Sequence, residues 1–124
     1  MANVVVWADI PVLDLERARR FYAHLLGTPV DYMPGTTEIA LLKSPGESSL
    51  MDVSADLAVG PTTPSTTHGP TVYVGSQSDI DGMLARAVEA GGKILTEKAF
   101  MVNVGWLAYI EDSEGNRIGI HQPG

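Results

Sequence analysis

Cysteine is absent from the 124 residues of this sequence. Its absence excludes disulfide bridges, thiolate metal sites and cysteine nucleophiles together. Basic residues are scarce, since 8 Lys and Arg stand against 15 Asp and Glu and give a formal net charge of -7. Phosphate binding needs a basic surface, so this balance argues against nucleic acid as a partner. The acidity serves solubility or, more weakly, favours a cationic or neutral ligand.

Long apolar runs are missing as well. No stretch approaches membrane-spanning length, and the first residues lack the basic-then-apolar profile of a signal peptide. We therefore expect a cytoplasmic protein with no membrane partner. The length suits one compact domain, and 44% hydrophobic residues are typical of a globular chain rather than a disordered one.

The segment 4–27 predicts a strand, a capped turn and an amphipathic helix. Valines at its start favour a strand, and Pro11 lies where that strand should end. Asp14 is a favourable N-cap, and Gly27 is the expected residue for a left-handed helix stop. Between them, apolar side chains recur at the spacing of one helix face: Leu15, Ala18, Phe21, Tyr22 and Leu25.

The second half of the chain contains a similar unit. A strand rich in valine and tyrosine again precedes a helix, at 79–90, which ends in glycines. Aligning Asp14 with Asp79 places Gly27 on Gly92 without a gap in the helix. Such a repeat in a short chain predicts an internal duplication. Two similar amphipathic helices that arose by chance are the alternative.

After each helix the pattern predicts three strands, at 29–32, 38–43 and 49–53 in the first half and at 93–98, 106–111 and 116–121 in the second. We therefore predict an α+β fold of two β-α-β-β-β modules in one domain. Module 1 covers about 1–57, a proline-rich connector about 58–68 and module 2 about 69–124. Each module covers one sheet face with its helix, and its other face pairs with the other module, from the same chain or a second one.

The first helix and the late hairpin 112–116 resemble the vicinal oxygen chelate superfamily. This superfamily includes glyoxalase I, fosfomycin- and bleomycin-resistance proteins and extradiol dioxygenases, and the sequence is most similar to its glyoxalase-like branch. Ser113 stands where the family usually has proline. The residues that carry the resemblance are Asp14, Arg17, Ala18, Phe21, Tyr22, Gly27 and the DSEGN hairpin. The resemblance covers nearly the whole chain and implies curled sheets that enclose a ligand cavity, in a homodimer.

The resemblance also implies where a divalent metal would bind. Enzymes of the family use His, Gln or Glu from the first and last strands of each module. The matching positions here are Trp7, Val72 (Thr71 if the register shifts by one), Gly119 and one residue within 50–52, where only Asp52 has a suitable side chain. Since most of these residues have no side-chain atom that can ligate a metal, no metal or other cofactor is expected.

Three polar residues belong to the cavity if the family geometry holds: Asp9, Asp52 and His121. Strand alternation places Asp9 on the same face as Trp7, and His121 on the same face as Gly119. These side chains either hold a displaced divalent metal, or Asp9 and His121 pair with each other or with water near a strand end.

Two tryptophans complete the predicted binding site. Trp7 occupies one of the positions at which the family has a metal-ligating residue, and Trp106 begins the strand that leads to the closing hairpin. Large, flat side chains suit stacking on a planar or apolar ligand, although Trp7 alternatively fills space that a metal once needed. Tyr73 and Tyr109 either line the same cavity or face the helices. The predicted binding residues are thus Trp7, Asp9, Asp52, Trp106 and His121.

These patterns favour a metal-free protein that binds a small organic molecule. The alternative is an enzyme of the same superfamily, a lyase, isomerase or dioxygenase. It would use shifted metal ligands or the acid–base pair of Asp9 and His121, the two catalytic candidates. A third interpretation is a structural or interaction module whose cavity the tryptophans fill.

Overall fold

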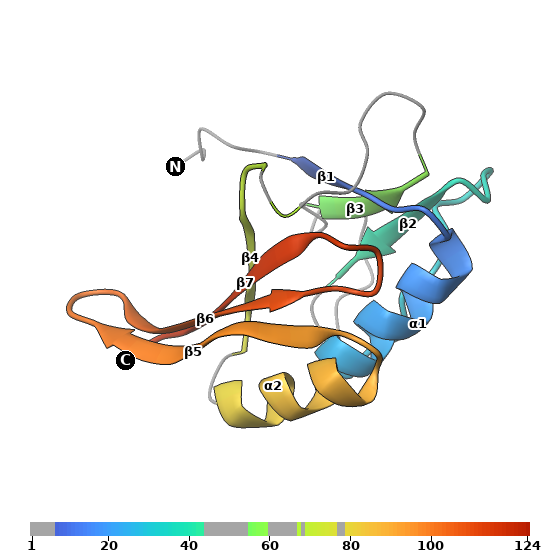
Figure 1. The fold of residues 1–124 in the computed structure, drawn as a ribbon. Coiled ribbons are helices and arrows are strands. Elements are labelled where there is room, and N and C mark those ends of the chain that lie inside the picture. Colours follow the sequence, from blue (N-terminus) through green and yellow to red (C-terminus); the bar gives the residue numbers. More distant parts are fainter. Residues whose placement is uncertain (1–6, 44–54, 60–66, 68, 77–78) are drawn as a thin grey trace.

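The computed structural model describes residues 7–43, 55–59, 67, 69–76 and 79–124. Their elements form two mixed sheets and two helices (Figure 1). The first sheet has the order β1-β3-β2, and the second has the order β4-β7-β6-β5. In chain order the elements are β1 (Ala8–Pro11), α1 (Leu15–Leu26), β2 (Ile39–Leu42), β3 (Ala55–Ala58), β4 (Val72–Gly75), α2 (Ile80–Glu89), β5 (Lys93–Met101), β6 (Gly105–Glu111) and β7 (Arg117–Gln122).

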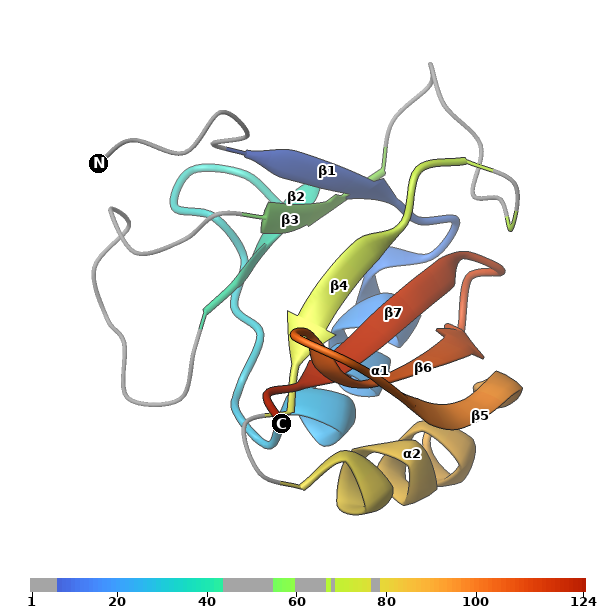
Figure 2. The ribbon, with the colours of Figure 1, turned by 90° about the vertical axis from the view of Figure 1, so that its left-hand side faces the viewer.

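The two sheets repeat one arrangement. β1 lies parallel to β3 with β2 antiparallel beyond it, and β4 lies parallel to β7 with β6 antiparallel beyond it. A bridge between Tyr32 and Ala40 extends the first sheet beyond β2, as β5 extends the second beyond β6. The predicted α+β class with two similar modules is therefore confirmed. The described strands of the two sheets do not close into one barrel (Figure 2).

The first module contains a strand that the sequence did not predict. β3 occupies Ala55–Ala58 and overlaps the start of the predicted connector. The predicted strand 49–53 lies outside the described residues. The position of β3 matters because it brings Asp56 next to β1.

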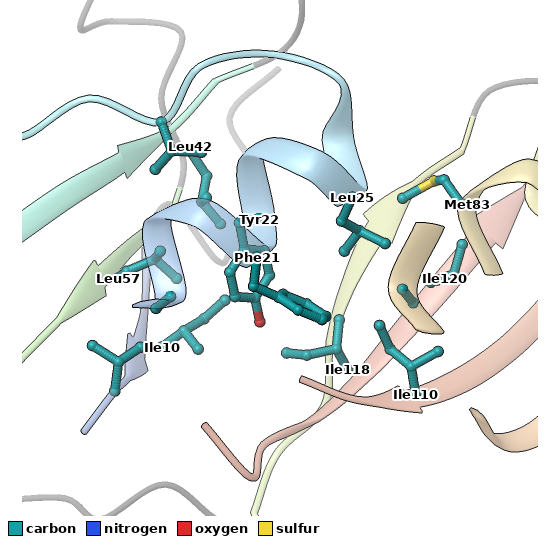
Figure 3. Close-up of a cluster of buried hydrophobic side chains, with 14 of the residues drawn as sticks. Ile10, Phe21, Tyr22, Leu25, Leu42, Leu57, Met83, Ile110, Ile118 and Ile120 are labelled. Atoms are coloured by element: carbon teal, nitrogen blue, oxygen red, sulfur yellow. The ribbon is translucent and has the colours of Figure 1, made fainter. Parts of the chain in front are cut away.

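The two helices begin and end as their sequences predict. Asp14 accepts a hydrogen bond from the Arg17 backbone N–H at 3.0 Å, and Gly27 ends α1 at φ 71°. The apolar faces of both helices are buried, and they contribute to one hydrophobic core. Figure 3 shows Phe21 and Tyr22 of α1 between side chains from the two sheets, so a single core joins the modules. Neither helix in the described part of the chain has the length and apolar character that crossing a membrane requires.

The turn between β6 and β7 fastens the second module to the first. Asp112 accepts a hydrogen bond from the buried Tyr22 hydroxyl at 2.6 Å, and Asn116 Nδ2 donates to the Pro11 carbonyl at 2.7 Å. Asp112 also accepts the backbone N–H of Asn116 at 2.9 Å, and Gly115 takes a φ of 91° within the turn. This turn therefore holds β1 and α1 against the second sheet.

Glu114 is the central residue of this contact, and only 3% of it is exposed. Its Oε1 atom accepts the backbone N–H groups of Leu13 and Asp14, each at 2.8 Å, at the start of α1. Its Oε2 atom lies 2.6 Å from Nε of Arg17. A carboxylate at a helix N-terminus satisfies backbone donors that have no partner within the helix. We call this arrangement the Glu114 clasp.

Each sheet turns one face to the helices. Ile10 and Leu57 of the first sheet and Ile118 and Ile120 of the second are fully buried in the core. Neighbouring residues of a strand point to opposite faces. The sheet faces that point away from the helices therefore carry Asp9, Asp56, Tyr73 and Gly119. We call that side the helix-free face of each sheet, and it carries the candidate site.

Candidate functional site

Two carboxyl groups lie side by side on the helix-free face of the first sheet. The parallel register of β1 and β3 pairs Asp9 with Asp56. The indole Nε1 of Trp7 donates to both, at 3.2 Å to Asp9 Oδ1 and 3.3 Å to Asp56 Oδ2. We call Asp9 and Asp56 the carboxyl pair. Trp7 is 41% exposed, so its ring is accessible to a ligand.

The two carboxyl groups differ in their environment. Asp9 is exposed, whereas Asp56 is only 4% exposed and its Oδ1 atom has no hydrogen-bond partner among the described residues. Burial, followed by the hydrogen bond and the charge of Asp9, raises the pKa of Asp56 to about 7, while the Trp7 donor acts in the opposite direction. A protonated Asp56 can donate to Asp9. The pair can therefore take up or release a proton near neutral pH.

The structure brings together only part of the predicted site. Trp7 and Asp9 are in contact, as strand alternation implies. Asp52 lies outside the described residues. Asp56 was missed because no strand was predicted at 55–58. The signal that could have found it is the short run ADLAV, in which Asp56 precedes the buried Leu57 with strand-like alternation.

His121 and Trp106 lie in the second sheet, apart from this cluster. His121 Nε2 lies 2.6 Å from the Val104 carbonyl, whereas Asp9 accepts from Trp7. Trp106 alternates with the fully buried Ala108 and therefore faces the helix side of its sheet. It contacts the Phe100 ring with centroids 5.3 Å apart. In this structure Asp9 and His121 have different hydrogen-bond partners, Trp7 and Val104, and the two tryptophans lie on different sheets, Trp7 on the helix-free face and Trp106 on the helix side.

The helix-free face of the second sheet carries a tyrosine pair. The hydroxyl oxygens of Tyr73 and Tyr109 lie 2.6 Å apart, and the Arg117 guanidinium lies 4.0 Å from the Tyr109 ring centroid. Both tyrosines therefore face away from the helices. The hydrogen bond with Tyr109 is the main cause that raises the pKa of Tyr73, so the Tyr73 phenol stays neutral near neutral pH and can act as a hydrogen-bond donor.

Tyr73 covers Gly119, its partner across the parallel strands β4 and β7. A Cβ atom at position 119 would come within 2.3 Å of the Tyr73 ring. The ring therefore occupies the space into which any side chain at position 119 would project. Glycine is required here by close approach of a ring, because its backbone has no unusual φ.

The chain matches a known family along most of its length. The model of the Glyoxalase/Bleomycin resistance protein/Dioxygenase superfamily matches residues 4–120. The chain belongs to this superfamily. No curated protein is significantly similar to it in sequence.

Solved structures of this superfamily share the fold. A glyoxalase/bleomycin resistance protein from Albidiferax ferrireducens is 24% identical with a TM-score of 0.72, over 98% of this chain and 100% of that one. An antibiotic-binding protein from a Streptomyces species is 23% identical with a TM-score of 0.65, over 100% and 99%. The fosfomycin resistance protein of Listeria monocytogenes, complexed with Mn(II) and sulfate, is 14% identical with a TM-score of 0.70, over 100% and 93%. At these identities the likeness establishes the fold.

At three of the four positions that the resemblance implies for a divalent metal, the residue in this chain does not fit the role of a ligand, and the fourth position, Asp52, lies outside the described residues. Trp7 presents an indole N–H, which donates rather than ligates. Gly119 has no side chain, and the Tyr73 ring covers it. Val72 packs against the core. Within the described residues, no three His, Cys, Asp or Glu side chains form a cluster that could hold a metal ion.

Substituting Gly119 by alanine tests how tightly the tyrosine covers it. We expect a loss of about 1–3 kcal/mol in the free energy of unfolding, because the added methyl group displaces the Tyr73 ring. Denaturant titration measures the loss. Gly75→Ala on β4 is the matched control, since a Cβ atom there meets nothing within 4 Å. In a Tyr73→Ala background, Gly119→Ala should be nearly neutral; an unchanged loss there would contradict the explanation.

Proposed function

We propose that the protein binds a small organic molecule on the helix-free faces of its sheets, through its own side chains and without a resident metal. The observation that carries this proposal is the Tyr73 ring over Gly119, at the position where the family resemblance expects a metal-ligating glutamate. A flexible glutamate at this position would have to displace the ring.

Aromatic side chains support binding of a planar or apolar ligand. Trp7 is 41% and Tyr73 48% exposed, and each ring also carries a polar group that is already oriented by a hydrogen bond. Such rings supply apolar contact area at low entropic cost, and their polar groups give direction. The similar fold of the antibiotic-binding protein from Streptomyces is consistent with this use.

Trp7 provides the direct test of this function. Because its ring is 41% exposed, Trp7→Ala should cost clearly less folding stability than the about 3–5 kcal/mol that is typical of a fully buried tryptophan. Binding of any compound found in a screen of aromatic small molecules should weaken about tenfold or more. Affinity is measured by isothermal titration calorimetry, with EDTA present throughout.

The control for this test is Trp106→Ala, which removes the tryptophan that packs beside Phe100 on the helix side. It should lower stability and leave affinity nearly unchanged. Binding that EDTA abolishes would contradict a metal-free site. A loss of several kcal/mol of stability in Trp7→Ala would show that Trp7 is packed core rather than ligand surface.

Acid–base catalysis is the second candidate function, and the raised pKa of Asp56 favours it. A carboxyl group that titrates near neutral pH, hydrogen-bonded to an exposed carboxylate, is suited to move a proton to and from a bound molecule. This chemistry belongs to an isomerase or lyase. NMR would detect it as chemical conversion of a bound compound. Asp56→Asn should abolish this conversion and leave binding of the compound intact.

A further inference from the structure

The carboxyl pair has more hydrogen-bond acceptor atoms than there are hydrogen-bond donors around it. Among the described residues, the four oxygens of Asp9 and Asp56 share one donor besides the proton of Asp56, the Trp7 N–H. The Asp56 side chain is more than nine-tenths buried, yet its Oδ1 atom has no hydrogen-bond partner in the described part of the chain. Buried polar atoms are nearly always paired, so this oxygen marks a place where a donor is missing.

Among the described residues, no ion pair joins a positive side chain to Asp9 or Asp56 either. The ion pairs of the described residues join Arg, Lys and His to other carboxylates, such as Glu114, Glu16 and Asp81. The chain as a whole carries a net charge of -7, which attracts cations from solution. The cluster is therefore negative, rich in acceptors and open to solvent at Asp9.

We infer that Asp9, Asp56 and Trp7 bind the protonated amine of a small organic ligand, with the ammonium group on Asp9 and the adjoining apolar part against the Trp7 ring. This inference rests on the proposed function and names the chemical class of its ligand. An ammonium group offers three donors to the surplus carboxylate oxygens. The exposed ring of Trp7, whose N–H edge meets these oxygens, offers apolar contact to the rest of the ligand.

A bare divalent cation matches this site less well. Hard cations take six or more oxygen ligands, whereas two carboxyl groups and an indole N–H converge here. The indole N–H donates and repels a metal ion. An organic ammonium needs fewer oxygen partners, and the Trp7 ring gives its apolar part a surface to cover.

Three probes of one shape test the inference: 1-naphthylmethylamine, 1-naphthylmethanol and 1-naphthoate. Calorimetric titrations run at about pH 8 in EDTA, where the amine is still mostly protonated. We expect the amine to bind about tenfold or more tightly than the alcohol, and the carboxylate to bind most weakly, since a charge-assisted hydrogen bond contributes about 1.5–3 kcal/mol. In Asp9→Asn the preference for the amine over the alcohol should fall below about twofold.

Asp31→Asn is the matched control, because it removes the same charge from an exposed residue next to Tyr32 at the far edge of the first sheet. It should keep the preference for the amine. Asp9 is exposed, so its asparagine variant should fold, and a thermal melt confirms this. Equal binding of amine and alcohol overturns the inference and leaves small-molecule binding intact. No binding by any probe overturns both. Displacement of the amine by Mn²⁺ or Mg²⁺, without EDTA, would show a metal site instead.

Discussion

Replacing Glu114 with alanine is expected to lower the free energy of unfolding by about 2–4 kcal/mol, one of the two largest effects that we predict. The substitution leaves the backbone N–H groups of Leu13 and Asp14 without their acceptor and removes the partner of the Arg17 guanidinium. It also opens a cavity at a residue that is only 3% exposed. Denaturant titration at neutral pH measures the change.

Glu97→Ala is the control for the Glu114 clasp. Glu97 lies exposed on β5, so its loss should change stability by no more than about 0.5 kcal/mol. Arg17→Ala should cost less than Glu114→Ala, because nearly half of the Arg17 side chain is exposed. Equal losses in the Glu97 and Glu114 variants would show that the clasp contributes nothing.

The pH dependence of the clasp has a definite sign. Burial alone would raise the pKa of Glu114, but hydrogen bonds from Arg17, the Asp14 and Leu13 backbones and Ser113 outweigh it and hold the pKa below its ordinary value. The stabilisation is therefore complete above the unfolded pKa and is lost as the pH falls through the lower folded pKa. The stability difference between the native protein and Glu114→Gln should shrink correspondingly in acid.

The sequence predicted the helices well because their signals are local. The Asp14 cap, the Gly27 stop and the apolar stripe between them lie within one short segment. The hairpin at 112–116 was predicted for the same reason, and Gly115 takes a positive φ within it. The clasp was not predicted, because Glu114 and Asp14 lie 100 residues apart and only the packing of the two modules brings them together.

The candidate site was predicted in part for a related reason. Trp7 and Asp9 share one strand face, which alternation reveals. The partner of Asp9 depends instead on the register of β1 with β3, strands separated by more than 40 residues. The space above Gly119 depends likewise on β4, whose Tyr73 covers it. Periodicity within a segment contains no information on such registers.

Replacing Asp56 with asparagine is expected to stabilise the protein above neutral pH by about 2–4 kcal/mol. An acid whose folded pKa is raised stabilises the fold fully below its unfolded pKa, and this contribution is lost as the pH rises through the folded pKa. For Asp56 the folded pKa is about 7, so the loss falls between about pH 4 and pH 7. Asparagine has no such proton to lose, and its amide can donate to Asp9 while it accepts from Trp7.

The measurement is the difference in unfolding free energy between Asp56→Asn and the native protein from about pH 4 to pH 8. It should grow with pH and level off above 7, whereas Asp31→Asn should show no such growth. When the same comparison is made in an Asp9→Asn background, the effect of Asp56→Asn on the unfolding free energy should still grow with pH, but by less. Burial is the largest cause of the raised Asp56 pKa, and it remains when the charge of Asp9 is gone. A pH-independent difference would mean that Asp56 ionises as it does in water. The proposal of acid–base catalysis would then lose its support. The proposal of amine binding would keep its support, because it rests on the unpartnered Oδ1 atom of Asp56 and on Trp7.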